Sequence, residues 1–279
     1  MVTTLNLGPI GVSLDIGPDD AHLAAAAEIE RLGYSTVWIP GGQLDRLDRI
    51  TELLRATRTI AVAPGIIPVD VYPASAVAGL YAELQRAAPG RFVVGLGGPQ
   101  RPRPLRALGH YLDELDAADP PVPAARRLLA ALGPRKLELA RERAAGAVPL
   151  LVNPAYTAEA RSVLGEQRTL VVSQVVVLDT DPDRARDLAR GTLGFLAQVR
   201  GYRQQWARFG FAEAELDGLA DRLVDELVAW GEPEVIIDRV RAHRAAGADQ
   251  VVLTALSDGP QPGPLATARL LADALLDGR

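Results

Sequence analysis

Along the whole chain, short apolar runs typical of buried strands alternate with segments that show the apolar spacing of helices. In one such segment, Leu47, Ile50 and Leu54 fall on one helical face. Regular strand–helix alternation predicts a parallel sheet covered by helices. The eight predicted strands are residues 12–15, 36–39, 60–64, 92–96, 127–132, 149–152, 170–178 and 250–256.

Glycine and proline mark the joints between these segments. Gly33, Gly90, Gly146 and Gly247 each stand between a helical segment and the next run, where a left-handed glycine commonly ends a helix. Prolines stand at the opposite joints, because the first turn of a helix tolerates a missing N–H group. These are Pro18, Pro73, Pro134, Pro154, Pro182 and Pro233.

Eight strand–helix units in 279 residues predict an α/β fold, the (β/α)8 TIM barrel, in preference to an open doubly wound sheet. The spacing is broken once, where about 70 residues separate predicted strands 7 and 8. We expect a helical insertion there, at about residues 197–232, of the kind that usually forms a lid or a dimer surface. No linker divides the chain, so we predict a single domain over residues 1–279.

Composition excludes several classes of partner. The formal net charge is −5, from 30 Lys plus Arg and 35 Asp plus Glu, which predicts no basic surface for nucleic acid. No apolar run approaches the ~20 residues that span a bilayer, and residues 1–6 lack the pattern of a signal peptide. We therefore expect a cytoplasmic protein that binds neither nucleic acid nor membrane.

The chain offers few reactive side chains. Cysteine is absent, and the single lysine is Lys136, so thiolate chemistry is excluded and Schiff-base chemistry would depend on one residue. His22, His110 and His243 show no metal-ligand spacing and none follows a predicted strand, so the sequence predicts no metal site and no catalytic triad. We expect His243 to be buried and hydrogen-bonded, and His110 to be exposed. A bound cofactor would then have to carry the reaction.

The carboxyl ends of the predicted strands, where barrels place their active sites, are rich in glycine. Glycine lets the backbone approach a ligand closely. Anion binding is favoured most by the turn at Gly133 and Pro134, because a helix N-terminus follows and Arg135 and Lys136 add positive charge. An ordinary helix start with proline at its first position remains the alternative reading of this turn.

Taken together, the ordered segments resemble the luciferase-like monooxygenase superfamily, and within it the actinobacterial oxidoreductases that use the deazaflavin coenzyme F-420. The most specific element is Pro-Gly-Arg-Phe-Val-Val-Gly-Leu-Gly at residues 89–97. Further landmarks are residues 26–39, 63–69, 111–116, 129–135 and 221–231. The resemblance implies a barrel, usually dimeric, that binds a reduced flavin or deazaflavin at the carboxyl ends of its strands.

The resemblance also implies which residues hold the coenzyme. Gly65 and Ile66 match a bulge that often contains a non-prolyl cis peptide bond behind the ring. The turn at Gly133, Pro134 and Arg135 matches the phosphate site. The same cavity would be lined by Pro40, Gly41, Gly97 and Gly98.

The expected activity is hydride transfer between coenzyme F-420 and an unidentified small organic substrate, in a homodimer. The alternatives are a two-component FMN-dependent monooxygenase that uses reduced flavin and oxygen, and a non-catalytic barrel that binds a ligand or a partner subunit. The sequence departs from the family pattern at Pro40–Gly42, at Pro68–Asp70 and at Tyr156, which stands where histidine is common. The catalytic residues are therefore unassigned, and Tyr156, Asp15 and Asp70 are the candidates for the proton donor.

Overall fold

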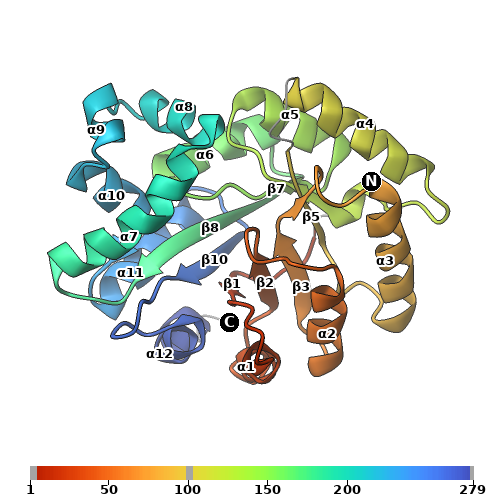
Figure 1. Ribbon diagram of the computed structural model, residues 1–279, viewed down its shortest axis with the longest axis horizontal. Helices are drawn as coiled ribbons and strands as arrows, with labels where there is room; N and C mark the ends of the chain where they lie inside the picture. Colours follow the sequence, from red (N-terminus) through yellow and green to blue (C-terminus); the bar gives the residue numbers. More distant parts are fainter. Residues whose placement is uncertain (1–4, 99–102, 277–279) are drawn as a thin grey trace.

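The computed structural model describes residues 5–98 and 103–276, and its core is a ten-stranded parallel sheet surrounded by helices (Figure 1). The strands are β1 (Ile10–Ser13), β2 (Thr36–Pro40), β3 (Ala61–Gly65), β4 (Ile67–Pro68), β5 (Val94–Gly97), β6 (Arg127–Leu129), β7 (Gly146–Ala147), β8 (Thr169–Val177), β9 (Val228–Trp230) and β10 (Gln250–Ala255). The helices are α1 (Ala21–Arg31), α2 (Asp48–Ala56), α3 (Ala74–Ala87), α4 (Pro104–Ala117), α5 (Pro134–Arg143), α6 (Pro154–Leu164), α7 (Pro182–Ala197), α8 (Arg200–Arg208), α9 (Glu213–Asp217), α10 (Asp221–Leu227), α11 (Pro233–Ala245) and α12 (Pro264–Leu276).

The sheet closes on itself and confirms the predicted barrel. Its strand order is β3-β2-β1-β10-β8-β7-β6-β5-β4, and β9 pairs with β8. The two ends meet through a parallel bridge between Val62 of β3 and Phe92, which lies just before β5. Val62 N–H donates to Arg91 O at 2.8 Å, and Val93 N–H donates to Val62 O at 3.1 Å.

Side chains of successive strand residues alternate between the barrel interior and the surrounding helices. On β2, Val37 and Ile39 join the cluster that packs under the helices, whereas Trp38 joins the interior cluster. The Nε1–H of Trp38 is shared between Thr36 Oγ1 and Gln250 Oε1, each 3.1 Å away. Trp38 therefore packs in the barrel core, as expected for a residue in the middle of a strand.

Three of the four predicted glycine joints are confirmed. Gly33, Gly90 and Gly247 have φ values of 97°, 76° and 102°, in the left-handed region. Gly146 differs, because it lies within β7, where a Cβ atom would be only 1.8 Å from the carbonyl oxygen of Thr169. Glycine is needed there for close strand approach and does not end a helix.

The position predicted for the sixth strand is consequently wrong. Residues 149–152 contribute only a bridge from Leu150 to Ser173, and the ladder forms at Gly146–Ala147 instead. Two small residues carry none of the β-branched signal by which strands are recognised. Four of the six prolines stand where they were predicted, because Pro134, Pro154, Pro182 and Pro233 each open a helix. Pro73 is instead the N-cap of α3, and Pro18 lies before Asp20, the N-cap of α1.

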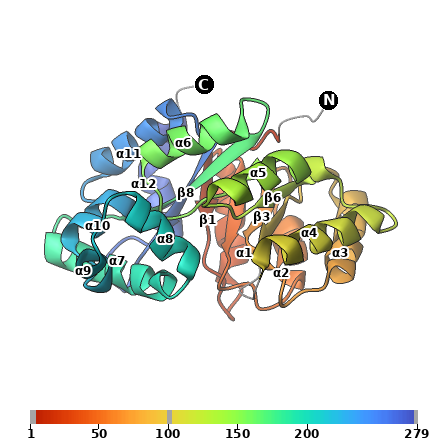
Figure 2. The ribbon, with the colours of Figure 1, turned by 90° about the horizontal axis from the view of Figure 1, so that it is seen from above.

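The long stretch between β8 and β10 forms the predicted helical insertion. Its helices α8, α9 and α10 gather beside α7 on one side of the barrel (Figure 2). Trp206, Leu216 and Leu223 pack there in a second hydrophobic cluster with Val175 and Val177 of β8. The insertion also contains β9, a short strand that the sequence analysis did not predict. None of the described helices is long and apolar enough to cross a membrane.

Glu30, near the end of α1, anchors the segment that leads into β3. Its carboxylate accepts backbone N–H groups from Arg58, Thr59 and Ile60 at 2.5 to 3.1 Å. Burial raises the pKa of Glu30, but these hydrogen bonds outweigh it and lower the pKa from 4.5 to about 2. The carboxylate therefore stabilises the folded chain in its charged form.

Replacing Glu30 by glutamine should lower the free energy of unfolding at pH 7 by roughly 2 kcal/mol, because charge-assisted hydrogen bonds are lost. The folded pKa is depressed, so the difference from wild type is complete above pH 4.5 and disappears as the pH falls towards 2. Urea unfolding at pH 7 and at lower pH measures it. Glu28→Gln, which affects a surface pair with Arg269, is the control and should change stability less. An equal effect of both changes would contradict this role of Glu30.

Candidate functional site

The predicted coenzyme-binding residues lie at one edge of the barrel, at the carboxyl ends of neighbouring strands. Pro40 at the end of β2 pairs with Gly65 at the end of β3. Pro68 at the end of β4 pairs with Gly97 at the end of β5. The Gly133 turn follows β6, which is the next strand in the sheet. The fold thus brings together the four segments that the sequence analysis selected.

Three of these segments pack closely together around Ile66. A Cβ atom on Gly41 would lie 2.6 Å from the backbone nitrogen of Ile66 and 2.8 Å from the carbonyl oxygen of Gly65. A Cβ atom on Gly97 would lie 2.0 Å from Cδ1 of Ile66. A side chain at Gly41 would displace the backbone of the bulge, whereas a side chain at Gly97 would displace the side chain of Ile66. The surface presented here is mostly backbone and the single aliphatic side chain of Ile66.

The expected cis peptide bond at Gly65–Ile66 is wrong, because among the described residues the one cis bond joins Asp119 to Pro120. Ile66 lies between β3, which pairs with β2, and β4, which pairs with β5. The chain changes its pairing partner at this residue with a trans bond, which is the lower-energy form for a non-prolyl residue.

The turn before α5 presents a helix N-terminus to the same edge. Gly133 is the N-cap, no side chain caps the first turn, and a Cβ atom on Gly133 would meet nothing within 4 Å. Pro134 and Arg135 are exposed. An uncapped helix N-terminus with open space before it is a ready site for an anionic group.

Lys136 brings a positive charge to the glycine-rich edge; the sequence analysis counted it in the anion-binding turn but did not include it among the coenzyme-binding residues. Its Nζ atom lies 3.0 Å from where a Cβ of Gly98 would be. The side chain is half-buried and makes no hydrogen bond or ion pair with any described residue. Burial lowers the pKa of its ammonium group. An unpaired, half-buried ammonium group is a natural partner for an anionic ligand.

These residues fit the coenzyme that the family resemblance implies. A flat ring could lie against the backbone of residues 40–41, 65–66 and 97, where Gly41 and Gly97 let the strand ends pack closely around Ile66. A phosphate-bearing tail needs N–H donors and positive charge, which the Gly133 turn and Lys136 supply.

Tyr156 contacts the backbone just before this turn through its hydroxyl group. It is not placed to donate a proton at the barrel edge. It is 1% exposed, and its hydroxyl lies 3.1 Å from Ala131 O and 2.9 Å from Leu132 O. Burial raises the pKa of this hydroxyl. Tyr156 is therefore a positioning residue for the Gly133 turn. Asp15 and Asp70 are exposed, and Asp15 accepts a hydrogen bond from Gln43 at 2.7 Å.

Both expectations for individual histidines are confirmed. His243 is fully buried on α11, with Nδ1 2.7 Å from Thr157 Oγ1 and Nε2 2.8 Å from Gln174 Oε1. Burial, helped by Arg239, lowers its pKa to about 3, so it is a neutral core residue. His110 lies on α4 with a side chain that is 64% exposed.

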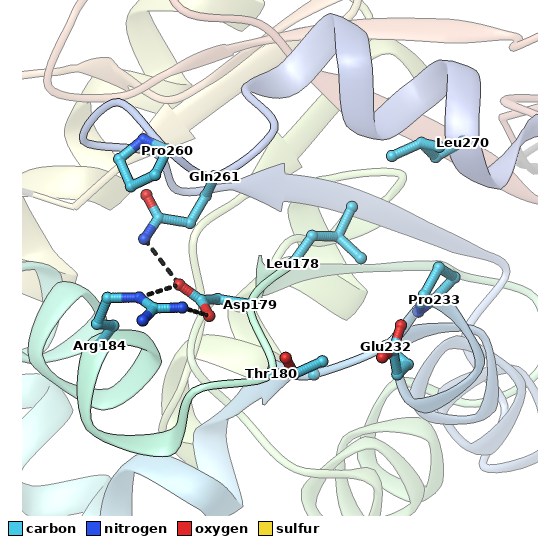
Figure 3. Close-up of a pocket in the computed structure, with 10 residues that line it drawn as sticks. Leu178, Asp179, Thr180, Arg184, Glu232, Pro233, Pro260, Gln261 and Leu270 are labelled. Atoms are coloured by element: carbon cyan, nitrogen blue, oxygen red, sulfur yellow. Dashed lines mark hydrogen bonds and ion pairs between the residues drawn. The ribbon is translucent and has the colours of Figure 1, made fainter.

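A groove of about 430 Å³ lies at another part of the barrel edge, beside the ends of β8 and β9 (Figure 3). Its main polar group, Asp179, accepts two hydrogen bonds from Arg184, at 2.7 and 3.0 Å, and one from Gln261 at 3.1 Å. The bonds from Arg184 contribute most to holding the pKa of Asp179 at about 2. Asp179 thus ties β8 to α7 and to the loop before α12, and it is not poised for acid–base chemistry.

Comparison with known proteins agrees with the fold. The sequence matches the model of a family described as luciferase-like monooxygenase, over residues 11–118 and 100–250. No curated protein sequence matches the chain.

Several solved structures share the architecture. An F-420-dependent secondary alcohol dehydrogenase, in complex with an F-420–acetone adduct, aligns over 98% of this chain and 99% of its own, with a TM-score of 0.75 and 15% identity. The F-420-dependent tetrahydromethanopterin reductase from Methanopyrus kandleri aligns over 97% and 99%, with a TM-score of 0.67 and 17% identity. The FMN-bound oxygenating constituent of 3,6-diketocamphane monooxygenase from Pseudomonas putida aligns over 98% and 99%, with a TM-score of 0.65 and 15% identity. At such identities these likenesses establish the fold.

Proposed function

Since the chain belongs to the luciferase-like monooxygenase family, we propose that it is an oxidoreductase that transfers hydride between coenzyme F-420 and a small organic substrate. The observation that carries the proposal is a glycine-rich strand edge next to an uncapped helix N-terminus, with Lys136 beside it and without a partner among the described residues. We also propose that the protein acts in the cytoplasm as a homodimer. Light scattering would then give twice the chain mass of 29.7 kDa.

In this proposal the coenzyme supplies the hydride chemistry, and the protein supplies position and electrostatics. Ile66 and the glycines Gly41 and Gly97 form the surface on which the ring lies. The Gly133 turn and Lys136 hold the phosphate, and Tyr156 holds that turn in place through its hydroxyl. No side chain is assigned as a proton donor.

The deciding experiment titrates the purified protein with coenzyme F-420 and, in parallel, with FMN. We expect saturable F-420 binding at micromolar concentration and FMN binding at least tenfold weaker. Tighter binding of FMN, together with oxygen consumption when a flavin reductase is added, would favour the two-component monooxygenase, which the likeness to the FMN-bound structure supports. Binding of neither compound would refute both proposals.

A further inference from the structure

A buried histidine without a hydrogen-bond partner lies at the start of α1, close to α2. His22 is 3% exposed, and neither of its ring nitrogens has a partner among the described residues. One ring nitrogen of His22, an oxygen of Asp20 and an oxygen of Glu52 all lie within 4.8 Å of one another. A buried polar group without a partner is costly, so an unpaired imidazole that faces two carboxylates points to a ligand between them.

We propose that Asp20, His22 and Glu52 form a binding site for a divalent first-row transition metal ion such as Zn²⁺. Imidazole nitrogen and carboxylate oxygen are regular ligands of these ions, and three protein ligands leave a fourth position for water or another group. Ligand atoms on one tetrahedral Zn²⁺ lie about 3.4 Å apart, so these atoms need to approach one another by up to about 1.4 Å. None of the three residues belongs to the proposed coenzyme site.

Arg49 now places a positive charge where the metal ion would bind. Its Nη1 lies 3.2 Å from Asp20 Oδ1 and 3.4 Å from Glu52 Oε2. The other guanidinium nitrogens, Nε and Nη2, donate to the two oxygens of Asp45 at 3.1 and 3.3 Å. A metal ion would displace the Nη1 contacts alone, because Asp45 still binds the guanidinium and Arg46 still pairs with the other oxygen of Glu52.

The local charges favour a cation. The guanidinium groups of Arg46 and Arg49 are paired with three carboxylates, those of Asp20, Asp45 and Glu52. Asp19 adds a further negative charge near His22. The buried imidazole of His22 offers a ring nitrogen without a hydrogen-bond partner to such a cation. The neutral ring is the form that binds metals.

The test uses untagged full-length protein freed of metals by dialysis against a chelator. Titration calorimetry with Zn²⁺ should show one ion bound per chain with micromolar affinity, and Co²⁺ should give the visible absorption of a nitrogen- and oxygen-ligated ion. His22→Ala and Glu52→Gln should each weaken Zn²⁺ binding at least tenfold. His110→Ala, which changes an exposed histidine, is the matched control and should leave binding unchanged.

A fourth variant tests the competition with Arg49. Arg49→Gln removes the resident positive charge and should strengthen Zn²⁺ binding severalfold, an effect that a purely structural role of the cluster would not produce. Circular dichroism and the unfolding midpoint check each variant, and Glu52→Gln carries the test if His22→Ala does not fold. Absence of saturable binding by the wild type, or unchanged binding in the ligand variants, would overturn the proposal. Neither result depends on coenzyme binding, so this proposal and the proposed function can fail separately.

Discussion

Gly146→Ala should lower the free energy of unfolding by at least about 3 kcal/mol and leave much of the protein insoluble. The added Cβ would lie 1.8 Å from the carbonyl oxygen of Thr169 and 2.6 Å from its carbonyl carbon, so the clash is with backbone atoms that cannot rotate away. Relief requires β7 and β8 to separate, and this would open the barrel beside the Gly133 segment. Urea unfolding and soluble yield measure the effect.

Gly191→Ala is the matched control, because it makes the same chemical change at an exposed position inside α7. A Cβ atom there would meet nothing within 4 Å, and alanine in a helix interior is favoured over glycine by about 0.5–1 kcal/mol. The same substitution should therefore destabilise at one site and stabilise at the other. A Gly146→Ala protein as stable as wild type would show that close strand approach does not require glycine here.

Lys136→Met should weaken the binding of coenzyme F-420 by about 10- to 100-fold, which corresponds to roughly 1.5–3 kcal/mol for a hydrogen bond to a charged group. The half-buried ammonium group lies beside Gly98 and has no partner among the described residues, so an anionic tail would be its first counter-charge. Removing an unpaired charge from a half-buried position should not lower the stability of the free protein. Fluorescence titration measures the affinity, and thermal unfolding the stability.

The dependence of F-420 affinity on ionic strength and on pH provides a second test of the role of Lys136. The affinity of the wild type should fall more steeply with ionic strength than that of Lys136→Met, because one charge pair has been removed. Since burial lowers the pKa of Lys136, its charge is lost at lower pH than that of an exposed lysine, and the difference between the two proteins should narrow in alkaline solution. Arg55→Met removes an exposed charge from the last turn of α2 and is the control. Equal F-420 affinity in all three proteins would show that Lys136 does not bind the coenzyme.

Patterns that act within a few residues of the chain were predicted well. The runs at β2, β8 and β10 are long and rich in β-branched residues, and the structure confirms them as strands. Proline at the first helical position and glycine in the left-handed region are also local constraints. Short strands were missed at β4, β7 and β9, where two or three residues pair because neighbouring strands hold them in place.

For the candidate site, the sequence indicated the segments but not the contacts. The glycine-rich strand ends could be listed in advance, since a barrel places such ends on one edge. The contact of Lys136 with Gly98 joins residues 38 positions apart, and no local pattern predicts it. The same holds for the cluster at His22, because a search for spaced histidines overlooks a carboxylate from the next helix.

The sequence by itself determined the barrel class, the glycine-rich strand ends of the proposed site and the scarcity of reactive side chains, because these follow from periodicity and composition. Only the tertiary structure decided which glycine serves conformation and which serves close packing, and which charged groups are left without a partner. The physical reason is that a Cβ clash, a burial or an ion pair depends on distances between residues far apart in the chain. Those distances exist only after the barrel has closed.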